Sequence, residues 1–314
     1  MLTRQNLVNG AVNAGVSTLL GAGNLFTLGN VFYVDSGIGS NGNSGKEPDA
    51  PKASVDSAIG ACVANNGDVI VIAPGHAETV TATNIALDVA GVTIVGLGYG
   101  LARPTFTYGA AAATITVSAA NCVWRNCHFI GNFDNVAAAF TLGAAKNFTL
   151  ENNTFVDNSA ALHFLSIVVT GATDNDADSL TVVGNSWQAL ALAPNAFISI
   201  LAAEKWVYIA DNHCDMAATN DVGHFLTIAA KVMTGIRILR NILVVVGATD
   251  AAVGIFVTGS STTNTGVVAY NLVNSLDTTS ELIMTAALNL AQFENYYTGT
   301  ITATGKLWPA VDGA

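Results

Sequence analysis

The chain has 314 residues, of which 51% are hydrophobic and only 11% are charged, and its formal net charge at pH 7 is −11. Proteins that bind nucleic acid carry a basic surface, so this acidic balance argues against a nucleic-acid partner. No stretch of about 18 apolar residues is uninterrupted, and we therefore predict no membrane-spanning segment and no membrane partner. Soluble domains usually carry about 25% charged residues, so a surface this poor in charge indicates that other subunits cover part of it.

Residues 1–30 are predicted to form an extended N-terminal arm. The segment is partly apolar but is broken by Asn and Gly, and it lacks the basic and continuous apolar regions of a signal peptide. A disordered tail is the alternative, but large apolar side chains favour contact with a partner protein. The candidate partner contacts in the arm are Leu19, Leu20, Leu25 and Phe26.

A strand, a loop and a short helix are predicted to follow the arm. The strand begins at Val31, and the loop rich in Gly, Asn, Ser and Pro extends to residue 51. Ser54 can cap a helix in which apolar residues recur at helical spacing, and Gly67 can end it. We expect this helix, residues 51–66, to cap the first coil of a solenoid, because an open sheet edge invites aggregation.

Seven short segments then repeat along the chain. Six of them place an asparagine at the same position, and the first places Cys127 there, with successive intervals of 26, 32, 27, 29, 30 and 24 residues. Apolar positions on either side agree in nearly every segment, which argues against a chance alignment. The asparagines are Asn153, Asn185, Asn212, Asn241, Asn271 and Asn295.

Intervals of this length suit a triangular coil of three short strands and three turns. A short strand must bend sharply after about five residues, and asparagine tolerates the left-handed backbone conformation that such a bend needs. In stacked coils the asparagine amides would form a hydrogen-bonded ladder. With the β-branched runs at 67–75 and 91–100, we predict an all-β, right-handed parallel β-helix of about nine three-strand coils over residues 31–314.

The region from Val31 to Thr107 resembles the start of the pectate-lyase-like β-helix proteins that occur in tailed-phage genomes. The residues that carry the resemblance are VFYVDSGIGSNGNSGKEPDAPKASVDSAI, GDVIVIAPGHAETV and GVTIVGLGYGLARPTFT. The resemblance implies a parallel β-helix. It does not specify a function, because the superfamily includes pectin-degrading enzymes, glycan-cleaving tailspikes and inert virion proteins.

A search for catalytic groups covered the outward positions before each ladder residue. Glycoside hydrolases need two carboxylates close together, and no two neighbouring coils place carboxylates in one of these columns. A pair assembled from loops is the alternative. We predict no catalytic residue and no cofactor, and the four cysteines are expected to be buried thiols because their spacing fits no metal motif.

Two charged clusters have alternative interpretations. Arg237 and Arg240 could meet an anionic sugar, but a salt bridge or a subunit contact is favoured. Asp174, Asp176 and Asp178 alternate as in a calcium loop, yet the glycine and glutamate that such a loop requires are replaced by Ser179 and Asn185. A solvated acidic loop is favoured over a metal site.

The sequence favours a non-enzymatic virion protein that decorates the outer surface of a phage capsid as a homotrimer, bound to the major capsid protein. The low charge, the missing catalytic pair and apolar outward residues support this hypothesis. Val183, Leu239 and Phe293 are the candidate contacts on the rod. The alternative is a tailspike-type protein that binds or cleaves glycans, and a third hypothesis, a cellular polysaccharide lyase or adhesin, should show an export signal.

Overall fold

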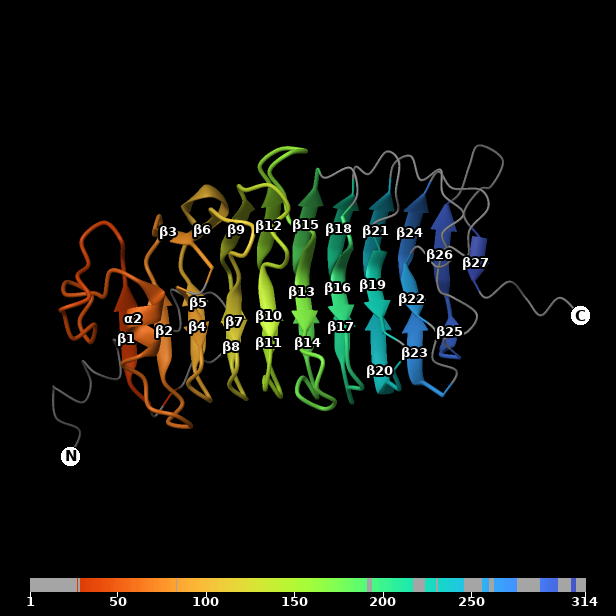
Figure 1. Cartoon of the computed structure of the whole chain (residues 1–314), viewed down its shortest axis with the longest axis horizontal. Coiled ribbons are helices and arrows are strands. Elements are labelled where there is room, and N and C mark those ends of the chain that lie inside the picture. Colours follow the sequence, from red (N-terminus) through yellow and green to blue (C-terminus); the bar gives the residue numbers. More distant parts are fainter. Residues whose placement is uncertain are drawn as a thin grey trace, which may run out of the picture.

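The computed structural model describes residues 27–298 and 306–308, apart from residues 28, 83, 191–193, 217–223, 230, 246–255, 260–262 and 276–288. The chain is an all-β parallel solenoid in which short strands stack into three sheets that run along the rod (Figure 1). The shortest sheet has seven strands among the described residues, which corresponds to about seven complete turns. The predicted number of nine coils is not confirmed, and the right-handed winding stays a prediction.

Sheet A contains the strands that lead to the ladder position of each coil. Each strand between the two end strands pairs in parallel with the strand one coil earlier and the strand one coil later. Its ten strands are β1 (Val31–Val34), β2 (Val69–Ile72), β5 (Thr93–Gly96), β8 (Val123–Arg125), β11 (Thr149–Glu151), β14 (Thr181–Val183), β17 (Tyr208–Ala210), β20 (Thr234–Leu239), β23 (Thr265–Ala269) and β25 (Ala291–Phe293).

Sheet B follows directly after each ladder position, and its strands are parallel except for β27, which pairs antiparallel with β26. Its ten strands are β3 (Ala77–Val80), β6 (Thr105–Tyr108), β9 (His128–Gly131), β12 (Thr154–Asp157), β15 (Ser186–Ala189), β18 (His213–Met216), β21 (Ile242–Val245), β24 (Leu272–Ser275), β26 (Asn295–Thr298) and β27 (Lys306–Trp308).

Sheet C closes the triangle. Its seven strands are β4 (Ala86–Leu87), β7 (Ile115–Val117), β10 (Phe140–Leu142), β13 (Ser166–Thr170), β16 (Ala196–Ile200), β19 (His224–Ile228) and β22 (Val257–Gly259). The connections into sheet C and out of it both differ in length from coil to coil, which explains the uneven intervals of the repeat.

The core consists of like side chains stacked from coil to coil. Phe106, Phe129 and Phe155 are fully buried, and their ring centroids lie 5.3 and 4.9 Å apart in a continuous stack. Parallel strands in register place equivalent residues above one another, so an aromatic residue in one coil favours an aromatic residue in the next. The four cysteines are free thiols. Three of them are buried in the core, and Cys62 is partly exposed.

The helix near the N-terminus is shorter than the sequence pattern predicts. The helix α2 (Val55–Ile59) begins after Ser54, whose hydroxyl accepts a hydrogen bond from the Ser57 N–H, but it ends at Gly60 rather than near residue 66. The buried Asp68 explains the early end, because its carboxylate accepts a 2.7 Å hydrogen bond from the Val63 N–H and turns the chain towards β2. The only other described helix is the 3-10 turn η1 (Gly100–Ala102), and no described helix could span a membrane.

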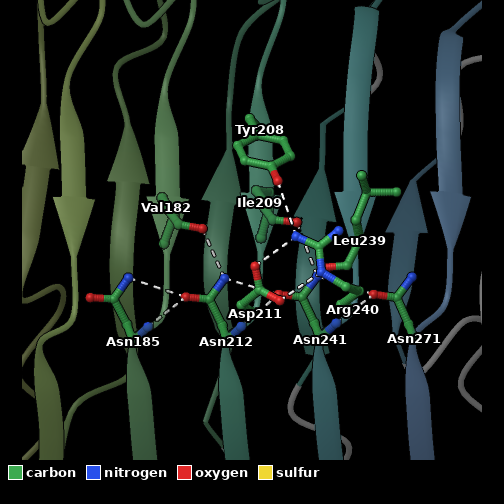
Figure 2. Close-up of polar contacts among 10 residues, drawn as sticks. All are labelled: Val182, Asn185, Tyr208, Ile209, Asp211, Asn212, Leu239, Arg240, Asn241 and Asn271. Atoms are coloured by element: carbon green, nitrogen blue, oxygen red, sulfur yellow. Dashed lines mark hydrogen bonds and ion pairs between the residues drawn. The ribbon is translucent and has the colours of Figure 1, made fainter.

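The six repeated asparagines lie at the bend between sheet A and sheet B, and Figure 2 shows four of them, Asn185, Asn212, Asn241 and Asn271, in one row. The Oδ1 atom of Asn212 accepts hydrogen bonds from the backbone N–H and the amide of Asn185, at 3.0 and 3.1 Å. The Asn212 amide in turn donates to the Val182 carbonyl and to Oδ1 of Asn241, both at 2.9 Å. The same contacts link Asn153, Asn185, Asn212, Asn241, Asn271 and Asn295 without a break.

The left-handed residue of each bend is not the ladder asparagine, as the sequence argument expected, but the residue before it. A φ between 49° and 66° occurs at Asn126, Asn152, Gly184, Asp211, Arg240, Tyr270 and Glu294, and at none of the six ladder asparagines. The preceding residue makes the turn, and the asparagine then points inward, where its amide reaches the neighbouring coils. The asparagine is therefore required for its hydrogen bonds and not for its backbone conformation.

Candidate functional site

The outer face of sheet B carries two columns of side chains that follow the ladder. Because side chains alternate along a strand, the residues one and three places after the ladder position point outward. Strand register aligns them from β6 to β18. The first column contains Thr105, His128, Thr154, Ser186 and His213, and the second contains Thr107, Ile130, Val156, Gln188 and Asp215.

Two adjoining hollows lie along these columns. The first has a volume of about 410 Å³ and is lined by Arg103, His128, Thr154 and their neighbours on β6, η1 and β9. The second, of about 240 Å³, is lined by residues of β12, β15 and β18, and Thr154 belongs to both. Together they form a groove, here called the sheet B groove, that crosses five strands and so extends about 19 Å along the rod.

Arg103 stands in the wall of the first hollow, directly after η1. Its Nε atom donates a 3.0 Å hydrogen bond to Oδ1 of Asn126. Its two terminal nitrogens donate to the Thr154 hydroxyl and, at 3.0 Å, to the Asn152 carbonyl. All three acceptors are neutral, so these contacts fix the position of the guanidinium without compensating its charge.

His128 lies next to Arg103 in the same hollow. Burial lowers the pKa of its imidazole, and the positive charge of Arg103 lowers it further. At neutral pH the ring is therefore uncharged and can accept a proton or share a hydrogen bond.

The second hollow is lined by groups that form hydrogen bonds in both directions. Ser186 and Gln188 come from β15, while His213 and Asp215, both exposed, come from β18. Such an assortment suits a ligand with many hydroxyl groups, and a neutral imidazole or a carboxylate can act as a general base. Asp215 is the single carboxylate among the described lining residues, so the groove does not show the two-carboxylate arrangement of glycoside hydrolases.

Beyond β18 the first column becomes apolar. Ile242, Leu272 and Tyr296 continue the first column and are 37%, 38% and 50% exposed. Tyr270 and Phe293, whose rings meet edge to face at 5.4 Å, lie beside them on the sheet A side of the bend and are also exposed. We call these five residues the C-terminal apolar patch.

The candidate contacts on the rod occupy one outer column of sheet A. Val183 and Leu239 are half-buried there, and Phe293 at the end of the column is 42% exposed. The candidate contacts of the arm, Leu19, Leu20, Leu25 and Phe26, lie outside the described residues. Of the three described candidates, only Phe293 lies on an exposed apolar surface.

The two arginines of the basic cluster have partners within the chain, and Figure 2 shows those of Arg240. The Arg240 guanidinium forms a two-pronged ion pair with Asp211, at 2.7 and 2.8 Å, and donates to the Tyr208 hydroxyl at 3.2 Å. The guanidinium carbon of Arg237 lies 4.9 Å from the centre of the Tyr208 ring. The salt-bridge interpretation therefore holds for Arg240.

The acidic loop after β13 uses its carboxylates to hold the next coil. Asp174 and Asp178 accept hydrogen bonds from the backbone N–H groups of Ala203 and Lys205, at 3.0 and 2.8 Å. Asp174 also lies 3.3 Å from the Lys231 ammonium. In the described part of the chain, no group of three His, Cys, Asp or Glu side chains is arranged to bind a metal ion. This holds for the loop that contains Asp174, Asp176 and Asp178 as well.

Glu204 lies against this loop and is only 1% exposed. Its Oε2 atom accepts a 3.0 Å hydrogen bond from the Ala177 N–H, while Oε1 is buried without a hydrogen-bond partner among the described residues. Burial, followed by the charges of Asp178 and Asp176, raises the pKa of Glu204 to about 7, against the weaker opposing effect of the Ala177 hydrogen bond.

The sequence analysis missed the sheet B groove because it examined only the positions before each ladder residue. The same alignment gives a polar column one place after the ladder position, from His128 to His213, and a mixed column three places after it, in which Ile130 and Val156 precede Gln188 and Asp215. Arg103 lies outside the repeated segments, and its place in the groove depends on the turn η1, for which the sequence carried no comparable signal.

Comparisons with known proteins give likeness in fold at low sequence identity. No family model matches the chain, and no curated protein matches it. Among solved structures, one titled "Rhamnogalacturonan lyase" is 14% identical with a TM-score of 0.42, over 85% of this chain and 87% of that chain. The GH136 lacto-N-biosidase from Eubacterium ramulus is 11% identical as the selenomethionine derivative and 10% as the native protein. The TM-scores are 0.31 and 0.29, and each match covers 86% of this chain and 68% of that chain.

These findings correct the prediction that the chain is not an enzyme. The solved structures reported above are a rhamnogalacturonan lyase and a lacto-N-biosidase, which are glycan-processing enzymes. The likeness agrees with the expected β-helix fold and shows no phage association. At these identities it concerns the fold alone.

Proposed function

We propose that the protein binds a carbohydrate chain along the sheet B groove. The observation that carries the proposal is the first column of the two hollows, which is polar at every coil from Thr105 to His213, with Arg103 at one end and Asp215 at the other. Stacked strands hold these groups at a regular spacing, so a chain of similar sugar units can meet one coil after another. His128 and Asp215 additionally supply groups for acid–base chemistry on a bound chain.

Filling the middle of the groove tests the proposal. Ser186→Tyr places a large side chain in the second hollow, one strand beyond Thr154, and is expected to weaken oligosaccharide binding by about tenfold or more. The measurement is calorimetric titration with a panel of neutral and acidic oligosaccharides, followed by an assay for released reducing ends. Thr181→Tyr, on the sheet A face of the same coil, is the matched control and should bind like the wild type. Equal binding by S186Y and the wild type, or no binding by either, would contradict the proposal.

The C-terminal apolar patch favours a second proposal, that the rods associate with one another. Contiguous exposed aromatic residues such as Tyr270, Phe293 and Tyr296 are typical of protein interfaces. We expect a homotrimer, and the resemblance of residues 31–107 extends the proposal to a phage particle, with the major capsid protein as partner and the outer capsid surface as location.

Sedimentation of the full chain tests the association. The wild type should sediment as a trimer, and Phe293→Ser combined with Tyr296→Lys should shift it to the monomer because the substitutions remove apolar contact area. Thr149→Lys, on the outer face of sheet A far from the patch, should leave the trimer intact. A monomeric wild type would refute self-association, and absence of the protein from purified phage particles would refute the virion location.

A further inference from the structure

Arg103 has no carboxylate partner among the described residues. Arg125, Arg240 and Lys231 each lie within 4.0 Å of a carboxylate, whereas no described carboxylate lies within that distance of Arg103. The chain has 22 acidic residues and 11 basic ones, so acidic partners are abundant. An arginine left without one, in the wall of a hollow of about 410 Å³, is therefore a local excess of positive charge.

The guanidinium is held ready for a ligand. It uses three of its five N–H donors on Asn126, Asn152 and Thr154, and two donors have no acceptor among the described residues. The side chain therefore loses little conformational freedom when a ligand binds, which favours affinity. A planar guanidinium matches the geometry of a carboxylate or another oxyanion better than an ammonium does.

His128 shows that this positive charge acts inside the hollow. Arg103 contributes to the lowered pKa of the imidazole, after burial. An anion bound between the two residues would oppose that effect and favour the protonated ring. By linkage, protonation of His128 would strengthen anion binding by the same factor.

We propose that the Arg103 hollow is a subsite for an oxyanion substituent, a carboxylate or a sulfate, on the saccharide that occupies the sheet B groove. This inference rests on the proposed carbohydrate-binding function and narrows its ligand to acidic glycans. Arg103 binds the oxyanion, Thr105 and Thr154 line the hollow beside it, and Leu101, which is fully exposed, stands at its rim.

The first experiment uses small probes that do not need the whole groove. Glucuronate, its uncharged methyl ester and inorganic sulfate are titrated into the full chain while the His128 imidazole signals are followed by NMR at several pH values. Glucuronate or sulfate should raise the pKa of His128, and the methyl ester should leave it unchanged. The comparison of glucuronate with sulfate distinguishes the two oxyanions.

Two variants assign the effect to the hollow. Arg103→Gln should weaken anion binding by about tenfold or more, because it removes the charge and the fork of donors. Leu101→Glu leaves the hydrogen bonds of Arg103 intact and places a competing carboxylate at the rim, so it should also weaken binding. Arg240→Gln, which removes an arginine outside the groove, is the control and should bind as the wild type does.

The outcomes distinguish failure of the proposed anion subsite from failure of the proposed carbohydrate-binding groove. A His128 pKa that saturating glucuronate and sulfate do not move, or that moves equally in R103Q, would overturn the subsite. Binding of neutral oligosaccharides in that case would leave the groove proposal standing. Anion binding that depends on Arg103, without binding of any oligosaccharide, would support the subsite as an anion site and refute the carbohydrate groove.

Discussion

Replacing Asn212 with leucine is expected to lower the free energy of unfolding by about 2–4 kcal/mol. The substitution keeps the size of the side chain but removes four buried hydrogen bonds. The backbone N–H of Asn185 and the carbonyl of Val182 then remain buried without these partners, and each such group costs about 1–3 kcal/mol. Chemical denaturation followed by circular dichroism measures the change.

The matched control for this prediction is another asparagine pair that spans two coils. The amide of Asn158 donates a 2.8 Å hydrogen bond to Asn132, but this pair is exposed to solvent. Water can replace that bond, so Asn158→Leu should change stability by less than about 0.5 kcal/mol. Equal losses in the two variants would show that the ladder bonds contribute no more than a surface contact.

Glu204 is expected to make the stability of the rod depend on pH. The pKa of its carboxyl is raised to about 7 in the folded chain, chiefly by burial. The proton is therefore bound more tightly in the folded state than in the unfolded state, where glutamate titrates near 4.3. The resulting stabilisation is fully present below about pH 4.3 and is lost as the pH rises through about 7.

Glu204→Gln removes this dependence, because the amide stays neutral and keeps an acceptor for the Ala177 N–H. Relative to the variant, the wild type should lose roughly 1–2 kcal/mol between pH 5 and pH 8. Urea unfolding of both proteins across this range gives the difference directly. Glu151→Gln, which alters a more exposed carboxylate on sheet A, is the control and should follow the wild-type profile. A constant difference between wild type and E204Q at all pH values would contradict the assignment.

The stack of coils could be predicted from the sequence because one residue type marks six successive bends. Asparagine at the ladder position is required by hydrogen bonds in both directions, so the six positions are visible without any structure. The bend itself was harder to assign, since the left-handed position accepts residues as different as Gly184, Arg240 and Tyr270. The residue before each ladder position is constrained only by its backbone conformation, so its residue type does not repeat along the sequence.

The groove could be predicted only in part. Its columns follow from the repeat, but Arg103 is placed by η1 and by contacts with Asn126 and Asn152 of later coils. The extent of α2 was likewise decided by a contact distant from the helix pattern, the bond from Val63 to Asp68. Hydrophobic periodicity predicts strands and helices, but it does not predict hydrogen bonds between segments that are distant in the sequence.

The hydrogen bonds of the ladder all have the same direction along the rod, and the ribosome synthesises the coils in the order in which the ladder connects them. Each asparagine supplies the acceptor for the N–H of the asparagine one coil earlier, so Asn153 depends on Asn185, and Asn271 depends on Asn295. As the chain leaves the ribosome from its N-terminus, every new bend remains incomplete until the following coil has been synthesised. The most recently synthesised coil therefore lacks the acceptor for its ladder N–H, and the next coil supplies that acceptor. Folding of the ladder thus follows synthesis with a delay of one coil.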